Sequence, residues 1–258
     1  MRDVSEWEIE LDETFAGPEL DAGVWLPYYL PQWSSRERAA ARYRFAPGGG
    51  LELLIEADQE PWCPEWDGEL RVSSLQTGVF AGEVGSHAGQ QSAFHDDAVV
   101  REAQPETRLY TPHYGRVETR LRAIDHSRAM VALWMIGFED APERSGEICI
   151  VEIFGRDVLG PDRARVGMGI HEFGDPALTE EWAQEELAID VTQPHDYAVE
   201  WGPGESAFFV DGEHVKTVAQ APDYPMQLML GVYEFPGDEP VAHPHVFAVE
   251  HVRGYRRV

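Results

Sequence analysis

Short stretches in which apolar and polar residues alternate recur along most of this 258-residue chain. Such alternation is typical of β-strands, because successive side chains of a strand point to opposite faces of a sheet. Strands are expected in the runs LELLIEA (51–57), YGRVETRLRAI (114–124), AMVALWMIGF (129–138), EICIVEIF (147–154), RVGMGIHEF (165–173), DYAVEWG (196–202), SAFFVDGEHVKTV (206–218), MQLMLGVYEF (226–235) and HVFAVEHVRGYRRV (245–258). With no regular helices between them, they predict an all-β protein, a sandwich or jelly roll of antiparallel sheets, with residues 1–258 as one domain.

Local signals add detail to this fold. Asp211-Gly212 lies between two short strand runs and predicts a tight type I′ hairpin. The stretch PALTEEWAQEELAID (176–190) is the one segment in which a helix is expected. Residues 25–43, rich in aromatics, and residues 80–110, long, polar and glycine-rich, are expected to form loops at the rim of the sandwich, where specificity often resides.

The charge balance limits the partners. A formal net charge of −27 disfavours nucleic acid and anionic membranes, and favours a neutral or cationic ligand. No apolar run is long enough to span a bilayer, and the acidic N-terminus carries no secretory signal, so the chain is expected in the cytoplasm as written, or secreted with its leader absent. A monomer is expected, and the two cysteines can form at most one disulfide.

The segment GEICIVEIFG (146–155) places two glutamates in an otherwise apolar strand. In a regular strand Glu152 would share a face with Ile148 and Ile150, which would bury an unpaired carboxylate among isoleucines. A β-bulge at Ile150 and Val151 would shift the alternation by one residue and bring Glu147, Cys149 and Glu152 to one face. We therefore expect a bulge and a pair of neighbouring carboxylates.

Two carboxylates about 5 Å apart on one sheet face suit retaining glycoside hydrolysis. One attacks the anomeric carbon, while the other protonates the leaving oxygen and later activates water. Repulsion from an ionised nucleophile raises the pKa of its partner, which can then act as an acid near neutral pH. On this scheme Glu147 is the nucleophile and Glu152 is the acid/base.

GEICIVEIFG resembles the active-site strand of family 16 glycoside hydrolases, usually written G-E-I-D-I-x-E, in the bulged form of the laminarinase-like branch. Further segments that resemble this family, in the same order, are DETFAGPELDAGVW, YGRVETRLRA, ALWMIGF, HDYAVEWGPGESAFFVDGEHV and AVEHVRGYRR. The resemblance implies a jelly roll of two curved sheets with a concave substrate cleft, and endo-acting hydrolysis of a β-1,3 or mixed-linkage β-glucan. It implies no cofactor for the reaction, although a structural calcium on the outer sheet occurs in the family.

The chain departs from the family pattern at two places. Cys149 stands where the family has an aspartate that orients the nucleophile, and a thiol is a weaker, normally neutral donor. The segment PERSG replaces a Trp-Pro pair that family members often carry before this strand. Two alternatives therefore stay open: a jelly roll that binds carbohydrate without cleaving it, and a transglycosylase that uses the same glutamates.

The resemblance also suggests further site residues, each with a plainer interpretation. Trp134 matches a position on the cleft floor, although an apolar strand would equally bury it in the core, and we favour the cleft. His171 resembles a histidine near the acid/base, or is a solvated turn residue. Trp33, Tyr28 and Tyr29 could stack on sugar rings, or could hold their own loop in place.

Overall fold

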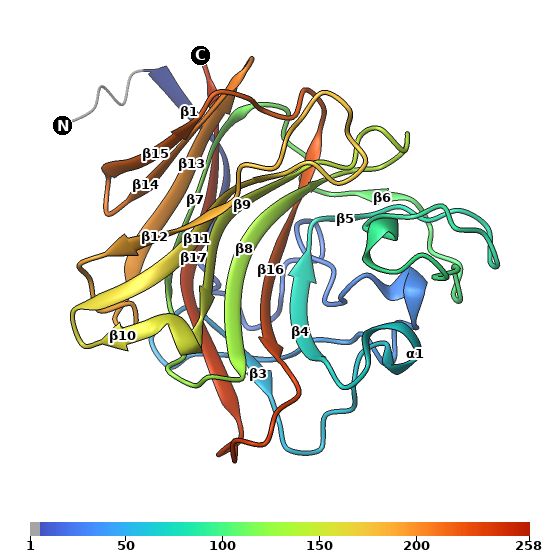
Figure 1. Ribbon diagram of the computed structural model, residues 1–258, viewed down its shortest axis with the longest axis horizontal. Coiled ribbons are helices and arrows are strands. Elements are labelled where there is room, and N and C mark those ends of the chain that lie inside the picture. The colour runs from blue at the N-terminus through green and yellow to red at the C-terminus, as the bar shows by residue number, and fades with distance from the viewer. Residues whose placement is uncertain (1–5) are drawn as a thin grey trace.

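Two antiparallel sheets make up most of the computed structural model, which describes residues 6–258 (Figure 1). The eight-stranded sheet runs in the order β15 (Glu213–Val218), β14 (Glu205–Val210), β13 (His195–Gly202), β7 (Gly115–Arg122), β17 (His245–Arg257), β3 (Leu51–Ile55) and β2 (Arg42–Phe45), with β1 (Trp7–Glu13) also paired to β17. The seven-stranded sheet runs β10 (Val158–Gly160), β11 (Arg163–His171), β9 (Glu147–Phe154), β8 (Ala129–Gly137), β16 (Met226–Glu234) and β4 (Arg71–Gln76), with β12 (Ala183–Leu187) also paired to β11. The short elements are β5 (Gly78–Val79), β6 (Thr107–Arg108), the helix α1 (Pro64–Asp67) and the 3₁₀ turns η2 (Pro31–Trp33), η3 (Ser92–Phe94) and η4 (Gly155–Asp157).

The main core lies between the two sheets and follows from the alternation in the sequence. On β8, Val131, Leu133 and Met135 point into this core, while Trp134 and Ile136 belong to a second cluster on the other face of the sheet. Both faces of β8 are therefore buried, which explains its nearly continuous apolar sequence. The predicted all-β jelly-roll fold is confirmed.

The second apolar cluster lies beneath loops that cover the seven-stranded sheet at its β8, β16 and β4 side. Trp33 and Trp62 from these loops are fully buried against Tyr233 and Trp134 of the sheet. Figure 1 shows α1 and the strands β5 and β6 on this side, next to β4. The loops predicted at 25–43 and 80–110 thus cover part of the sheet and bury some of their aromatic side chains against it.

The hairpin expected at Asp211-Gly212 is confirmed. Val210 of β14 pairs with Glu213 of β15, so the turn has two residues. Both have positive φ, 49° at Asp211 and 78° at Gly212, as a type I′ turn requires.

The helix expected at 176–190 is wrong. Residues 183–187 form the strand β12, in which Glu186 pairs with Arg165 and Gln184 with Gly167 of β11. Strand pairing at this edge satisfies backbone groups and lets the preceding Trp182 cover Gly167, where an added Cβ would lie 2.6 Å from the indole. These tertiary contacts outweigh the helix propensity of an alanine- and glutamate-rich segment.

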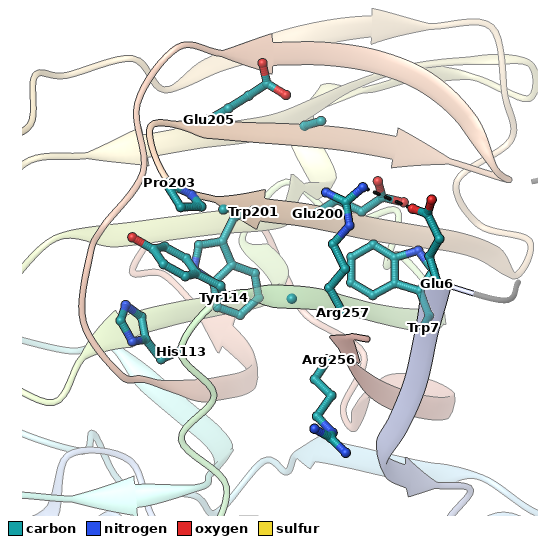
Figure 2. A pocket seen from close by; sticks show the side chains of 13 residues that line it. Glu6, Trp7, His113, Tyr114, Glu200, Trp201, Pro203, Glu205, Arg256 and Arg257 are labelled. Carbon is teal, nitrogen blue, oxygen red and sulfur yellow. Dashed lines mark hydrogen bonds and ion pairs between the residues drawn. The ribbon is translucent and has the colours of Figure 1, made fainter. Parts of the chain in front are cut away.

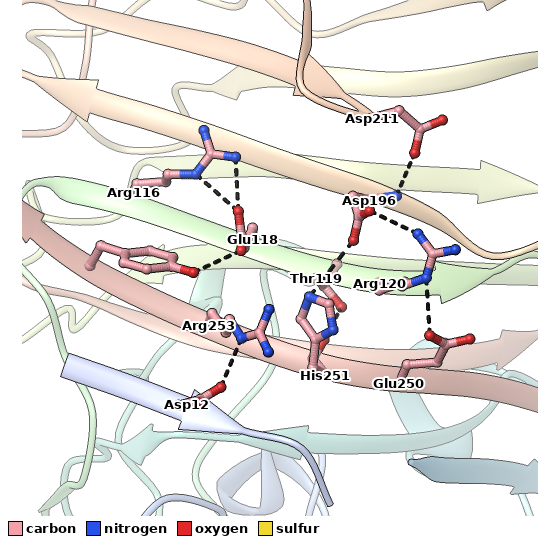
Figure 3. Close-up of polar contacts among 11 residues, drawn as sticks. Asp12, Arg116, Glu118, Thr119, Arg120, Asp196, Asp211, Glu250, His251 and Arg253 are labelled. Carbon is pink, nitrogen blue, oxygen red and sulfur yellow. Dashed lines mark hydrogen bonds and ion pairs between the residues drawn. The ribbon is translucent and has the colours of Figure 1, made fainter. Parts of the chain in front are cut away.

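The exposed face of the eight-stranded sheet carries rows of ion pairs (Figure 3). Arg116 bonds Glu118 on its own strand and Glu200 on β13, and Arg120 bonds Asp196 and Glu250. Such partly exposed pairs each contribute little to stability, about 1 kcal/mol or less. Their main effect is to satisfy charges on a face that remains in water.

A buried carboxylate at one end of the seven-stranded sheet is the centre of a cluster of ion pairs. Glu234 at the end of β16 is only 1% exposed. Its carboxylate pairs with Arg71 at 3.3 Å, Arg128 at 3.0 Å and His243 at 2.7 Å. His245 also lies 3.3 Å from it, and burial lowers the pKa of His245 to about 4. This cluster ties β4, β8 and β16 to the segment that leads into β17.

Candidate active site

A bulge in β9 brings the two glutamates to one face. Against β8, Val151 faces Leu133 and Cys149 faces Trp134, so that Ile150 is the extra residue. Ile148, Ile150, Val151 and Ile153 all enter the main core, which leaves Glu147, Cys149 and Glu152 on the opposite face of the sheet. The bulge predicted from the sequence is therefore confirmed, and it is this bulge that keeps Glu152 out of the core.

Glu147 is the more buried of the two carboxylates, with 9% of its surface exposed. The side-chain Nε2 of Gln91 donates a hydrogen bond to its Oε2 at 3.2 Å. Burial raises the pKa of Glu147 well above its usual range, and the neighbouring charge of Glu152 raises it further, while the Gln91 donor opposes both. Gln91 thus stabilises the ionised form of Glu147.

Glu152 is half-buried at the end of the bulge, and burial raises its pKa to about 7, with Arg156 acting in the opposite direction. Because two buried carboxylates repel each other when both are ionised, they titrate as a pair. Near neutral pH the pair therefore retains a proton that two ordinary surface glutamates would have lost.

The segment around Gln91 is held by a third buried carboxylate. The backbone N–H of Gln91 donates to Oε1 of Glu139 at 2.6 Å, and Glu139 is 8% exposed. Burial raises the pKa of Glu139 to about 8. Gln91 and Glu139 both have positive φ, 57° and 56°, a region that non-glycine residues rarely occupy. Neither residue belongs to an alternating pattern, and no signal in the sequence pointed to them.

Cys149 lies on the same face as the glutamates and is 1% exposed. Its Sγ lies 3.9 Å from the carbonyl oxygen of Gly167. Burial and the charges of Glu152 and Glu147 raise the pKa of Cys149, so the thiol stays neutral. It therefore places no third negative charge between the two carboxylates.

Trp134 lies on the face of the glutamates, as favoured from the sequence, but it is only 8% exposed. Its Nε1 donates to the hydroxyl of Tyr233 at 3.1 Å. Tyr29 packs edge-on against Tyr233, with ring centroids 5.6 Å apart, and the charge of Glu147 contributes to raising the pKa of Tyr29. Trp134, Tyr233 and Tyr29 thus form an aromatic wall beside Glu147, of which the sequence analysis had missed Tyr233.

The predicted stacking role of Trp33 needs correction. Trp33 is 0% exposed, and its Nε1 donates to the carbonyl oxygen of Gln90 at 2.7 Å, so its ring holds two loops together and has no free face. Tyr28 is half-buried, and the guanidinium of Arg36 lies 5.4 Å from its ring centroid. One side of the Tyr28 ring therefore already has a partner within its own loop.

His171 ends β11 directly opposite Glu147 in the strand register, while Gly167 lies opposite Glu152. Its Nδ1 pairs with Glu180 at 2.9 Å, and its ring stacks on Trp182 with centroids 5.6 Å apart. Sequence analysis had placed Trp182 in a helix and missed it. The strand β12 instead brings this indole beside the site residues of β9 and β11.

A spacious groove of about 640 Å³ lies elsewhere, at one end of the eight-stranded sheet. Figure 2 shows Trp7, Tyr114 and Trp201 around it, together with the ion pair between Glu6 and Arg257. None of the residues that line it belongs to β9 or β11. The groove is therefore separate from the paired carboxylates Glu147 and Glu152.

The described residues 6–258 contain no group of three or more histidine, cysteine, aspartate or glutamate side chains arranged to hold a metal ion. Across the same residues, no helix has the length and apolar character needed to cross a membrane.

A two-sheet jelly roll whose bulged strand presents two carboxylates on one face, one buried and one half-buried, suits a glycoside hydrolase. Comparison with known proteins agrees with this class. Residues 105–247 match the family model described as Glycosyl hydrolases family 16. The chain belongs to this family, whose members act on O-glycosyl bonds.

Several solved structures share the fold of this chain. A GlcNAcα1-4Gal-releasing endo-β-galactosidase from Clostridium perfringens aligns with a TM-score of 0.83 and 30% identity, over 98% of this chain and 64% of that one. The chain thus spans somewhat less than two thirds of that structure. A laminarinase from Flavobacterium sp. UMI-01 aligns with a TM-score of 0.64 and 18% identity, over 96% and 100% of the two chains. A β-glucanase from Bacillus licheniformis aligns with a TM-score of 0.64 and 14% identity, over 96% of this chain and 98% of that one. A search of curated proteins found no significant match.

Proposed function

We propose that this protein is a retaining, endo-acting glycoside hydrolase in which Glu147 is the nucleophile and Glu152 the acid/base. The observation that carries the proposal is the bulge at Ile150, which brings both carboxylates to one sheet face. A bulge at this point would serve no purpose for packing alone, because a valine or isoleucine at 152 would suit a regular strand.

The two steps require Glu147 ionised and Glu152 protonated, a state that the Gln91 donor favours and that the burial of Glu147 opposes. Glu147, ionised and hydrogen-bonded by Gln91, attacks the anomeric carbon as Glu152 transfers its proton to the departing glycosidic oxygen. The products are a covalent glycosyl ester on Glu147 and a sugar with a free hydroxyl. Glu152, now a carboxylate, takes a proton from water, whose oxygen displaces Glu147 and restores the anomeric configuration.

The pKa of Glu152, raised to about 7, fits the acid role. A glutamate with an ordinary pKa would be almost entirely ionised at neutral pH and could not protonate the leaving oxygen. The neutral thiol of Cys149 helps indirectly, since a further charge beside Glu147 would oppose its ionisation. Cys149 is therefore compatible with turnover.

For the substrate we propose a β-linked polysaccharide, and two candidates stand side by side. The laminarinase-like form of the bulged motif supports a β-1,3 or mixed-linkage β-glucan. The 30% identity to an endo-β-galactosidase, higher than that to the laminarinase and the β-glucanase, supports a glycan with β-galactosidic bonds. The two sugars differ in the orientation of one hydroxyl, so a panel of soluble β-glucans and galactose-containing glycans separates them.

The first experiment measures reducing-sugar release from this panel by the wild type, Glu147→Ala and Cys149→Asp. Turnover by the wild type that disappears in Glu147→Ala supports the proposal, and the fastest substrate gives the specificity. A wild type that binds but never cleaves, with activity gained in Cys149→Asp, would replace the proposal by carbohydrate binding alone.

A second experiment separates the roles of the two glutamates. Azide can enter the space left by a truncated carboxylate and attack the sugar from the same side. With an activated aryl glycoside, Glu147→Ala should yield the α-glycosyl azide, because no covalent ester forms, whereas Glu152→Ala should yield the β-glycosyl azide. The opposite products would exchange the two roles.

A further inference from the structure

We propose that Gln91, fixed in place by Glu139, is the residue that positions the nucleophile Glu147 in this enzyme, in place of any group at position 149. The inference rests on the proposed function and adds a positioning residue to it. It starts from the hydrogen bond of 3.2 Å from Nε2 of Gln91 to Oε2 of Glu147, and from the N–H of Gln91 bonded to Glu139.

The contact between Gln91 and Glu147 is a hydrogen bond from an amide to a carboxylate. A side-chain amide that donates to a carboxylate stabilises its ionised form and fixes its rotation, and such charge-assisted bonds are stronger than neutral ones. Glu147 needs this help, because both burial and Glu152 raise its pKa. Gln91 is itself 8% exposed, so water competes poorly for its amide.

Gln91 is held in place by contacts of its own loop. Gln91 comes from the long loop between β5 and β6, and an unsupported loop residue would position a nucleophile poorly. Its backbone N–H is bonded to Glu139 at 2.6 Å, and it holds the left-handed conformation with φ of 57°. The neighbouring Gln90 anchors the same loop, since its Nε2 donates to Gln227 of β16 at 2.7 Å.

Position 149 offers no strong hydrogen-bond donor that would compete with Gln91 for Glu147. The Cys149 thiol is a weak donor, and the contact of its Sγ is with the carbonyl of Gly167, 3.9 Å away and on the neighbouring strand. The other titratable groups around Glu147 are Glu152, Glu180 and Glu139, which raise its pKa, and the neutral phenols of Tyr29 and Tyr233. Gln91, and not the residue at position 149, therefore orients Glu147.

The test uses Gln91→Met, which keeps the length of the side chain but removes the amide donor. We expect kcat on the fastest substrate of the panel to fall about 10- to 100-fold with KM nearly unchanged, because Glu147 would be ionised in a smaller fraction of molecules and less well oriented for attack. The acid limb of the pH profile should move to higher pH, because the pKa of Glu147 rises without its donor. ¹³C NMR of labelled glutamate carboxyls, with the Glu147 signal identified from Glu147→Gln, reports the same shift without any turnover.

The matched control is Gln90→Met, in the adjacent buried glutamine of the same loop. It should lower the melting temperature without raising the pKa of Glu147. Glu139→Gln preserves a weaker acceptor for the Gln91 N–H, and should therefore cause a smaller loss in the same direction as Gln91→Met. If Gln91→Met and Gln90→Met have equal effects on the acid limb, Gln91 has only a structural role.

A double-mutant cycle gives the sharpest outcome. A protonated aspartate at position 149 could donate to Glu147, so Cys149→Asp should restore part of the activity in the Gln91→Met background and do little in the wild type. Independent, multiplying effects of the two changes would overturn the inference. Activity that survives in Glu147→Ala would instead refute the proposed function, and an unchanged NMR pKa of Glu147 in Gln91→Met would refute the inference alone.

Discussion

The raised pKa of Glu152 leads to a prediction about pH. With a pKa of about 7, Glu152 is about half protonated at pH 7, whereas a glutamate at the ordinary value of 4.5 would be about 0.3% protonated. Burial thus increases the fraction of enzyme that can donate a proton by about 150-fold at this pH. We expect kcat/KM on a polysaccharide to fall about tenfold per pH unit above pH 7, as Glu152 loses its proton.

The assay compares two substrates across pH 4 to 10. With an activated aryl glycoside, whose leaving group needs no proton, the alkaline limb of the glycosylation step should disappear. On that substrate Glu152→Gln should release one burst of leaving group and then stall, because the base for the second step is missing. An alkaline limb with an apparent pKa near 5, or one that persists in Glu152→Gln, would refute the assignment of Glu152 as the acid.

Three further predictions concern stability. Glu234→Ala removes the buried partner of two half-buried arginines, Arg71 and Arg128, and should lower the free energy of unfolding by about 3–5 kcal/mol, measured by urea denaturation. A loss below about 1 kcal/mol would contradict a stabilising role for these ion pairs. Since the pKa of His245 is lowered to about 4 in the folded state, the unfolded chain binds more protons below pH 6.5. The contribution of neutral His245 to the free energy of unfolding is complete above pH 6.5 and is lost as the pH falls towards 4, by at most about 3 kcal/mol. His245→Phe should therefore make the free energy of unfolding less dependent on pH in this range. Gly167→Ala should displace Trp182, lower the free energy of unfolding by about 1–3 kcal/mol and change the tryptophan fluorescence. As a control, Gly202→Ala, whose Cβ would meet nothing within 4 Å, should leave the free energy of unfolding and the fluorescence unchanged.

Much of the architecture could be predicted because it depends on short-range patterns. Alternation along β8 and β16 determines which side chains enter the core, and Asp211-Gly212 allows the positive φ values of its turn. The bulge could be predicted because only a shift at Ile150 keeps Glu152 out of an apolar core. The segment 176–190 could not, because an open edge beside β11 decided its conformation.

In the candidate site, too, some features depend on local sequence and others on tertiary contacts. The sequence alone predicted that Glu147 and Glu152 share one sheet face, since both lie on one strand and their relation depends only on local register. Tertiary structure decided the surroundings that control their protonation. Gln91 and Glu139 approach Glu147 from separate loops, and burial by these loops sets the pKa values, so no pattern within any one segment could reveal them.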